Sequence, residues 1–213
     1  MKDKVIKAVI FDIDGVLLDS FEANLKFFQN IFQASGYAPP SRKDYEQMFH
    51  LSMLDVIKKI SGSADEKEVM RIFNLGKDRA HFFPFELLKI PKDSESTLKA
   101  LSKKYVLSIT TSRVKEGVWP VPQLATLQKY FKVAVTYEDT EKHKPHPAPL
   151  LLTSEKMNVK PGEAVYIGDA ETDIIAAKAA GMKVIIYSKK IITGANFCTS
   201  SFKKIPELVK KCS

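Results

Sequence analysis

Cysteine is scarce in this chain of 213 residues, which contains only Cys198 and Cys212. Two cysteines near the carboxyl end cannot form a disulfide framework, and their spacing does not match a zinc-binding motif. This usage is typical of proteins in a reducing compartment. We therefore expect a cytoplasmic location.

Long hydrophobic runs are missing as well. The first apolar run, Val5 to Phe11, is too short and too soon followed by charge to be a signal peptide. No stretch approaches the roughly 20 apolar residues that a membrane-spanning helix needs. Internal repeats and low-complexity segments are also absent from the sequence. We expect no membrane partner, and one domain with a smaller insertion.

Positive charge is in excess, with a formal net charge of +8. The lysines are spread along the chain instead of forming one tract, and pairs such as Lys103-Lys104 fall at the ends of expected helices, where cations suit the helix dipole. This distribution favours a solvated surface and an anionic small substrate over nucleic acid. We expect no nucleic-acid partner, and either a monomer or a homodimer.

Five apolar runs rich in β-branched residues predict buried strands, at residues 5–12, 105–111, 133–136, 164–167 and 183–187. Helical patterns lie between the later strands, at residues 94–104, 122–130, 148–157 and 172–180, the last closed by Gly181. Continuous apolar strands that alternate with helices are typical of a parallel sheet covered on both faces. The fold class is therefore predicted to be α/β.

The segment between the first two strands breaks this alternation. Phe21, Leu25, Phe28 and Phe32 are at helical spacing, and further helices are expected around residues 44–49, 53–60 and 65–82. A crossover helix needs far fewer residues. We predict a helical cap domain, residues 18–88, inserted into a core domain of residues 1–17 and 89–213.

Two carboxylates, Asp12 and Asp14, follow the first strand and precede Gly15. In open α/β sheets, ligands bind at the carboxyl ends of the strands. Asp12 can attack phosphorus as a nucleophile, and Asp14 can protonate the leaving oxygen and later deprotonate a water molecule. An isolated Asp-x-Asp-Gly also occurs as a simple turn, so the interpretation depends on the other strand ends.

Hydroxyl and cationic side chains follow the next strands. The second strand ends in Thr111, Ser112 and Arg113, whose donors suit a phosphoryl oxygen, and Thr111 is preferred to Thr110 as the contact. Lys144, which precedes a proline, can neutralise the nucleophile and the phosphoryl group. Arg113 and His50 are candidate substrate contacts.

The fourth strand ends in Gly168 and Asp169, with Asp173 four residues further on. Magnesium prefers oxygen ligands from one or two carboxylates. Asp169 and Asp12 can supply them, with Asp14 and Asp173 nearby. His143 and His146 are a weaker metal pair, because their loop is broken by proline.

With these four motifs in order, the chain resembles the haloacid dehalogenase superfamily, in its phosphoglycolate phosphatase and β-phosphoglucomutase-like branch. The resemblance implies a Rossmann-like sheet in strand order 5-4-1-2-3, a helical cap and Mg²⁺. It implies a nucleophile at Asp12, an acid/base at Asp14, a phosphoryl contact at Thr111, charge neutralisation at Lys144, and metal ligation by Asp169 with Asp173. We therefore expect a Mg²⁺-dependent phosphatase that acts on a small phosphorylated metabolite through an aspartyl phosphate.

The chain departs from its branch where substrates are selected. Mutase relatives place an arginine near the position of Met53, so its absence argues against a mutase. A phosphomutase and a pyrophosphatase stay open as alternatives on the same fold, and so does a catalytically silent ligand-binding protein.

Overall fold

The computed structural model describes residues 5–213, except for the side chain of Arg79. Six strands form one parallel sheet in the order β3-β2-β1-β4-β5-β6. The strands are β1 (Ala8–Phe11), β2 (Val106–Thr110), β3 (Val133–Val135), β4 (Ala164–Gly168), β5 (Lys183–Tyr187) and β6 (Phe197–Thr199). The predicted α/β class and the order 5-4-1-2-3 are confirmed, and β6 adds a strand beside β5 that the sequence did not predict.

Alternate residues of each central strand serve two separate hydrophobic cores. In β1, Val9 and Phe11 belong to the larger core, and Ala8 and Ile10 to the smaller one. This division follows from the period-2 geometry of a strand, whose successive side chains point to opposite faces. Both faces are therefore covered, as continuous apolar strands require.

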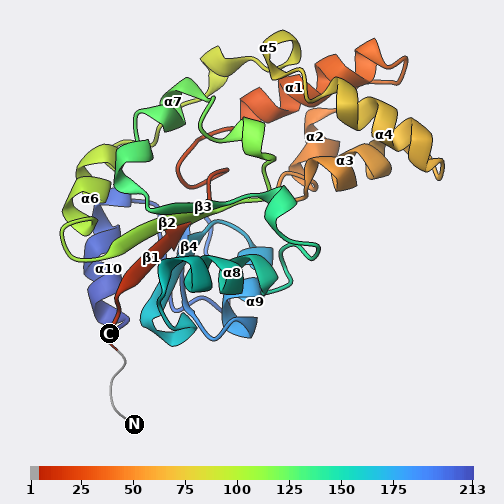
Figure 1. The fold of residues 1–213 in the computed structure, drawn as a ribbon. Coiled ribbons are helices and arrows are strands. Elements are labelled where there is room, and N and C mark those ends of the chain that lie inside the picture. Colours follow the sequence, from red (N-terminus) through yellow and green to blue (C-terminus); the bar gives the residue numbers. More distant parts are fainter. Residues whose placement is uncertain (1–4) are drawn as a thin grey trace.

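Helices form a layer on each face of the sheet (Figure 1). α8 (Ala148–Met157) and α9 (Glu171–Ala179) pack on the face of the smaller core, and α6 (Ser94–Leu101) and α10 (Ile205–Lys211) on the other. Gly181 follows α9 with a positive φ of 76°, as expected of a helix-ending glycine. The predicted helix 122–130 is shorter, because α7 (Pro122–Ala125) gives way to a 3₁₀ turn.

A group of helices, here called the helical insertion, lies between β1 and β2 in the chain (Figure 1). It contains α1 (Phe21–Ala34), α2 (Arg42–Glu46), α3 (Met53–Ser61), α4 (Glu66–Leu75) and α5 (Arg79–Phe82). The predicted single helix over 65–82 is two helices. The two connections to the core run side by side, since the Asp19 N–H donates to the Lys89 carbonyl at 2.8 Å and the Lys89 N–H donates back at 3.3 Å.

Serine and aspartate side chains begin three of these helices. Ser41, Ser52 and Asp65 accept hydrogen bonds from backbone N–H groups in the first turns of α2, α3 and α4. Such caps satisfy donors that a helix start leaves unpaired.

Within residues 5–213, no helix combines the length and the apolar character needed to cross a membrane.

Candidate active site

The carboxyl ends of the central strands meet the helical insertion around a cavity of about 60 Å³. Neighbouring strands are in register, with Phe11 of β1 opposite both Ile109 and Ile167, so the loops that follow begin at one level. The cavity lining contains all nine predicted site residues: Asp12, Asp14, His50, Thr111, Ser112, Arg113, Lys144, Asp169 and Asp173. The chemical role of each one stays a prediction.

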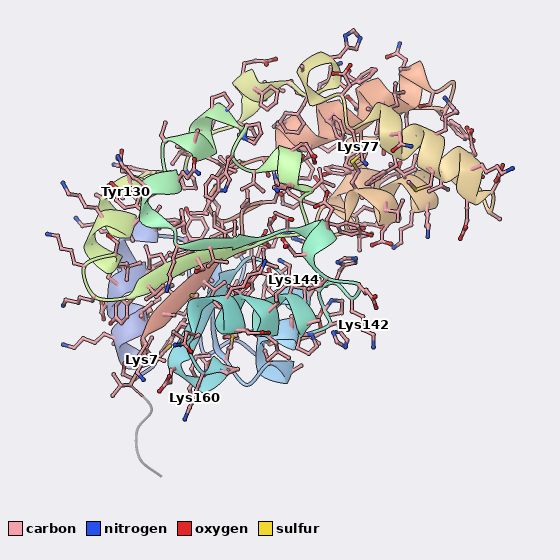
Figure 2. All side chains as sticks on the ribbon, viewed as in Figure 1. Lys7, Lys77, Tyr130, Lys142, Lys144 and Lys160 are labelled. Atoms are coloured by element: carbon pink, nitrogen blue, oxygen red, sulfur yellow. The ribbon has the colours of Figure 1, made fainter. Side chains whose placement is uncertain are left out.

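Lys144 lies inside the protein and is bound on all sides. Its Nζ is 2.6 Å from Asp12 Oδ2, 2.8 Å from Asp173 Oδ1 and 2.9 Å from the Tyr166 hydroxyl. Figure 2 shows Lys144 within the body of the molecule and the exposed Lys142 at its edge. An ammonium group has three protons, and three partners are present for them. Burial disfavours the charge, but the carboxylates of Asp12 and Asp173 outweigh it and raise the pKa of Lys144 well above its usual value.

Asp12, the predicted nucleophile, begins the loop after β1. Its Oδ1 accepts a hydrogen bond from the Ile13 N–H at 2.7 Å, and its Oδ2 faces Lys144. Burial raises the pKa of the Asp12 carboxyl to about 7, against the lowering effect of Lys144 and together with the charge of Asp173. A nucleophile has to be ionised. Additional positive charge close to Asp12 would therefore favour the form of its carboxyl that can attack.

Asp173 lies in the first turn of α9 with both oxygens already bound. Its Oδ2 accepts from the N–H groups of Asp169 and Ala170 at 2.9 and 3.1 Å, and its Oδ1 faces Lys144 and the Tyr166 hydroxyl. Burial would raise the pKa of Asp173, but Lys144 and these donors lower it below the usual value. Asp173 thus orients both Lys144 and the loop that carries Asp169.

The acidic side of the cavity fits a divalent cation. Asp12, Asp169 and Asp173 each offer an oxygen, and these oxygens lie within 4.8 Å of one another. Burial, and then the charges of Asp173 and Asp12, raise the pKa of Asp169 well above its usual value, as expected of carboxylates that repel one another. The lining carries four carboxylates against the two cations Lys144 and Arg113, so a divalent ion would bring these charges into balance.

Asp14 is held by a buried arginine. Arg113 donates from Nε to Asp14 Oδ2 at 2.7 Å and from Nη2 to Asp14 Oδ1 at 2.6 Å. Ser20 and Asn24 also donate to Oδ1. Burial alone would raise the pKa of Asp14, but the charge and hydrogen bonds of Arg113, with those of Ser20 and Asn24, hold it well below its usual range.

The two threonines at the end of β2 face different surroundings. Thr111 lines the cavity, and its Oγ1 accepts from the Arg113 N–H at 3.2 Å. The Thr110 hydroxyl is instead 2.6 Å from that of Thr153 in the buried interior. Of the pair, Thr111 therefore has the position suited to a phosphoryl oxygen.

The helical insertion supplies the remaining wall, which includes Asn24, Phe28, Tyr45, Phe49, Leu51 and Met53. His50 places its Nδ1 3.7 Å from Asp169 Oδ2, and burial lowers the pKa of its imidazole. Asn24 and Tyr166 were not predicted from the sequence as site residues. Asn24 had one signal, since it precedes Phe28 by four residues and is thus a polar residue on the apolar face of a helix.

The weaker histidine pair is engaged elsewhere. His143 stacks on Tyr137 with ring centroids 3.8 Å apart, and His146 Nδ1 accepts from the Ala148 N–H at 3.2 Å. Within the described part of the chain, the acidic cluster of Asp12, Asp169 and Asp173 is the group found with metal-ligand spacing.

Comparison with known proteins identifies the family. A family profile described as haloacid dehalogenase-like hydrolase matches residues 9–187. The pyrophosphatase PpaX of Bacillus cereus (strain G9842) is 30% identical over 184 residues, which are 86% of this chain and 83% of the relative. The chain therefore belongs to the haloacid dehalogenase-like hydrolase family, and the predicted family and its assignment as a hydrolase are confirmed.

Solved structures agree on the fold. A haloacid dehalogenase superfamily hydrolase of subfamily IA from Geobacter sulfurreducens is 30% identical, covers 96% of both chains and has a TM-score of 0.69. A β-phosphoglucomutase from Clostridium difficile has a TM-score of 0.80 at 21% identity, and the match covers 97% of this chain and 98% of the other. At that identity the second match speaks for the fold alone.

Proposed function

We propose that this protein is a Mg²⁺-dependent phosphatase that hydrolyses a small phosphomonoester through a phosphate ester on Asp12. The observation that carries the proposal is the placement of Asp12, which lies 2.6 Å from Lys144 within an acidic cluster at the strand ends. A nucleophile, a cation and an oxygen-ligand set are the components that phosphoryl transfer requires.

Magnesium would be held by Asp169 and Asp12, with Asp173 close by, and would supply positive charge that favours the ionised form of Asp12 and offsets charge on the phosphoryl group. An oxygen of Asp12 then attacks phosphorus, and the bond to the leaving oxygen breaks. Lys144 neutralises charge on Asp12 and on the phosphoryl group, and Thr111 holds a phosphoryl oxygen during this step. A water molecule releases phosphate from Asp12 in the second step.

Asp14 gives a proton to the leaving oxygen in the first step and takes one from water in the second. The ion pair with Arg113 has to open for this, because a paired carboxylate with a low pKa carries no proton at neutral pH. The proposed acid/base role of Asp14 therefore includes a rearrangement of Arg113 when substrate binds.

The size of the cavity favours a small substrate. A volume of about 60 Å³ has room for only a few water molecules, at roughly 10–15 Å³ each. A phosphate group is of this size, so the rest of a substrate has to enter by movement of the helical insertion, which we propose acts as a cap domain. Cap movement of this kind excludes bulk water from the reaction.

Pyrophosphate is a second candidate substrate, because the relative from Bacillus cereus is named a pyrophosphatase. Mutase activity is disfavoured, since Met53 lines the cavity where mutase relatives have an arginine nearby. A silent binding protein is disfavoured by the joint presence of the nucleophile, the acid/base and the acidic cluster. We propose a cytoplasmic location, in keeping with the free thiols of Cys198 and Cys212.

The test is phosphate release from a panel of phosphomonoesters, pyrophosphate and an aryl phosphate, each with Mg²⁺ or excess chelator. We expect Mg²⁺-dependent release that Asp12→Asn abolishes without loss of the fold. The matched control is Asp19→Asn, which alters an exposed carboxylate further along the same loop and should leave turnover unchanged. Full activity of a folded Asp12→Asn protein would refute the mechanism.

A further inference from the structure

Arg113 is a buried cation that lines the cavity. Its side chain is only 4% exposed, yet it lines the cavity beside the predicted catalytic groups. Nη1 donates to the Gly117 carbonyl at 3.0 Å, which fixes the guanidinium at the base of its loop. Nε and Nη2 form a two-pronged pair with Asp14.

The two cations of the cavity lining differ in the partners that an anion of the substrate would have to replace. Lys144 is committed to Asp12, Asp173 and Tyr166, and its charge belongs to the reacting centre. Arg113 directs two N–H groups at a single carboxylate, which is the geometry that arginine uses for phosphate and carboxylate groups of ligands. Among the described residues of the lining, Arg113 is thus the cation best suited to a second anion.

Asp14 also has partners that stay when its pair with Arg113 opens. Ser20 and Asn24 both donate to its Oδ1, and both come from the start of the helical insertion, outside the Arg113 loop. An anionic group of the substrate can therefore replace Asp14 on Arg113 and leave the Asp14 carboxylate hydrogen-bonded. The exchange frees Oδ2 of Asp14 from the Arg113 Nε–H that it accepts from in this structure.

We propose that Arg113 is a specificity-determining residue that binds a second anionic group on the substrate, close to the scissile phosphate. The inference rests on the proposed phosphatase function and deepens it. The substrate class is phosphate compounds that carry a phosphate or carboxylate within a few bonds of the leaving oxygen. Asp12 and Arg113 line the same cavity, and Arg113 is bonded to Asp14, two residues after Asp12, so the two anionic groups have to be near each other.

Matched substrates test the preference in the unaltered protein. One pair is 2-phosphoglycolate and 2-hydroxyethyl phosphate, which differ in the carboxylate, and the other is 1,2-ethanediol bisphosphate and 2-hydroxyethyl phosphate, which differ in the second phosphate. We expect kcat/KM to be higher for the anionic member of at least one pair, and the pair that shows it distinguishes a carboxylate from a phosphate. Equal kcat/KM within both pairs would overturn the proposal and leave the phosphatase function standing.

Substitution of Arg113 separates recognition from support of Asp14. In Arg113→Met, we expect KM for the anionic member of a pair to rise roughly 10- to 100-fold more than KM for its neutral partner, as for the loss of a charge-assisted hydrogen bond. Any harm to Asp14 lowers kcat for both members alike. An equal loss on both members, with their ratio unchanged, would show that Arg113 only positions Asp14 and would overturn the proposal.

Two further variants serve as controls for this experiment. Arg113→Lys keeps the charge without the two-pronged geometry and should give an intermediate ratio, so it carries the test if Arg113→Met does not fold. Lys115→Met removes an exposed cation from the same loop and should leave both ratios unchanged. Absence of phosphate release from every compound, in folded protein with Mg²⁺, would refute the proposed function itself.

Discussion

Gly15→Ala offers a test of the metal site that depends on atomic geometry. Gly15 has a φ of +74°, and a Cβ at this position would lie 1.9 Å from Asp169 Oδ2 and 2.5 Å from its Cγ. Two effects combine in the variant. The left-handed backbone costs roughly 1–2 kcal/mol for a residue with a side chain, and the new methyl group forces the Asp169 carboxylate away from its place beside Asp12.

Gly36→Ala is a matched control, because it has the first effect without the second. Gly36 has a φ of +82°, and a Cβ there would meet nothing within 4 Å. Both variants should therefore lose about 1–2 kcal/mol of unfolding free energy from backbone strain. Only Gly15→Ala should also lose its response to magnesium.

Urea unfolding with Mg²⁺ or excess chelator measures that response. At a Mg²⁺ concentration about 100 times Kd, binding to the folded state adds about 2.7 kcal/mol to the free energy of unfolding. We expect this gain in the unaltered protein and in Gly36→Ala, and less than half of it in Gly15→Ala, together with a large loss of turnover. A full Mg²⁺ gain and normal turnover in Gly15→Ala would refute the placement of the metal at Asp169.

Three further predictions concern the charges around the nucleophile. Lys144→Met should lower the free energy of unfolding in chelator by about 3–5 kcal/mol, because it leaves buried carboxylates unpaired. Its control is Lys156→Met, which removes a partly exposed ion pair and should cost less than about 1 kcal/mol. Equal losses in the two variants would contradict the argument from burial. Tyr166→Phe should lower the free energy of unfolding by about 1–3 kcal/mol and reduce kcat, because Lys144 loses a buried partner. Tyr130→Phe removes an exposed hydroxyl and should change neither quantity. An unaltered kcat in Tyr166→Phe would rule out a role of the Tyr166 hydroxyl in supporting Lys144. Burial raises the pKa of Asp12 to about 7, so the folded protein keeps a proton that the unfolded chain releases, and metal-free stability should fall as pH rises from about 4 through 7. Added Mg²⁺, which favours the ionised form, should raise the thermal midpoint more at pH 8 than at pH 6, and an equal shift at both values would contradict this linkage.

The parallel sheet was predictable because its strands are buried on both faces and so are continuously apolar. The strand 183–187 and the helix 148–157 are found within the predicted bounds. β6 lacked this signal, since it has three residues, Phe197–Thr199, and lies at the edge of the sheet against β5. Its place depends on pairing with Ile185 to Tyr187 of β5, and no local sequence pattern indicates this pairing.

The break between α4 and α5 has a packing origin. Helical periodicity continues through residues 65–82, but α4 ends at Leu75. A Cβ on the next residue, Gly76, would lie 2.2 Å from the Met53 side chain and 3.1 Å from that of Phe27. Gly76 has a helical φ of −70°, so its lack of a side chain serves the close approach of α1 and α3 and not a left-handed turn. The glycine was visible in the sequence, whereas the neighbours that require it were not.

The pairing of Asp14 with Arg113 shows where prediction from sequence ends for this site. The two residues are 99 positions apart, yet each follows its strand by a few residues, and β1 and β2 are neighbours in register. Strand order thus places their loops together, and a carboxylate and a guanidinium at one sheet edge are expected to meet. The partners from the helical insertion, Ser20 and Asn24, have no such register to locate them, because their positions depend on how α1 packs over the sheet. The meeting of Asp14 and Arg113 can therefore be predicted from the strand ends, whereas the hydrogen bonds of Ser20 and Asn24 to Asp14 depend on contacts that only the folded insertion creates.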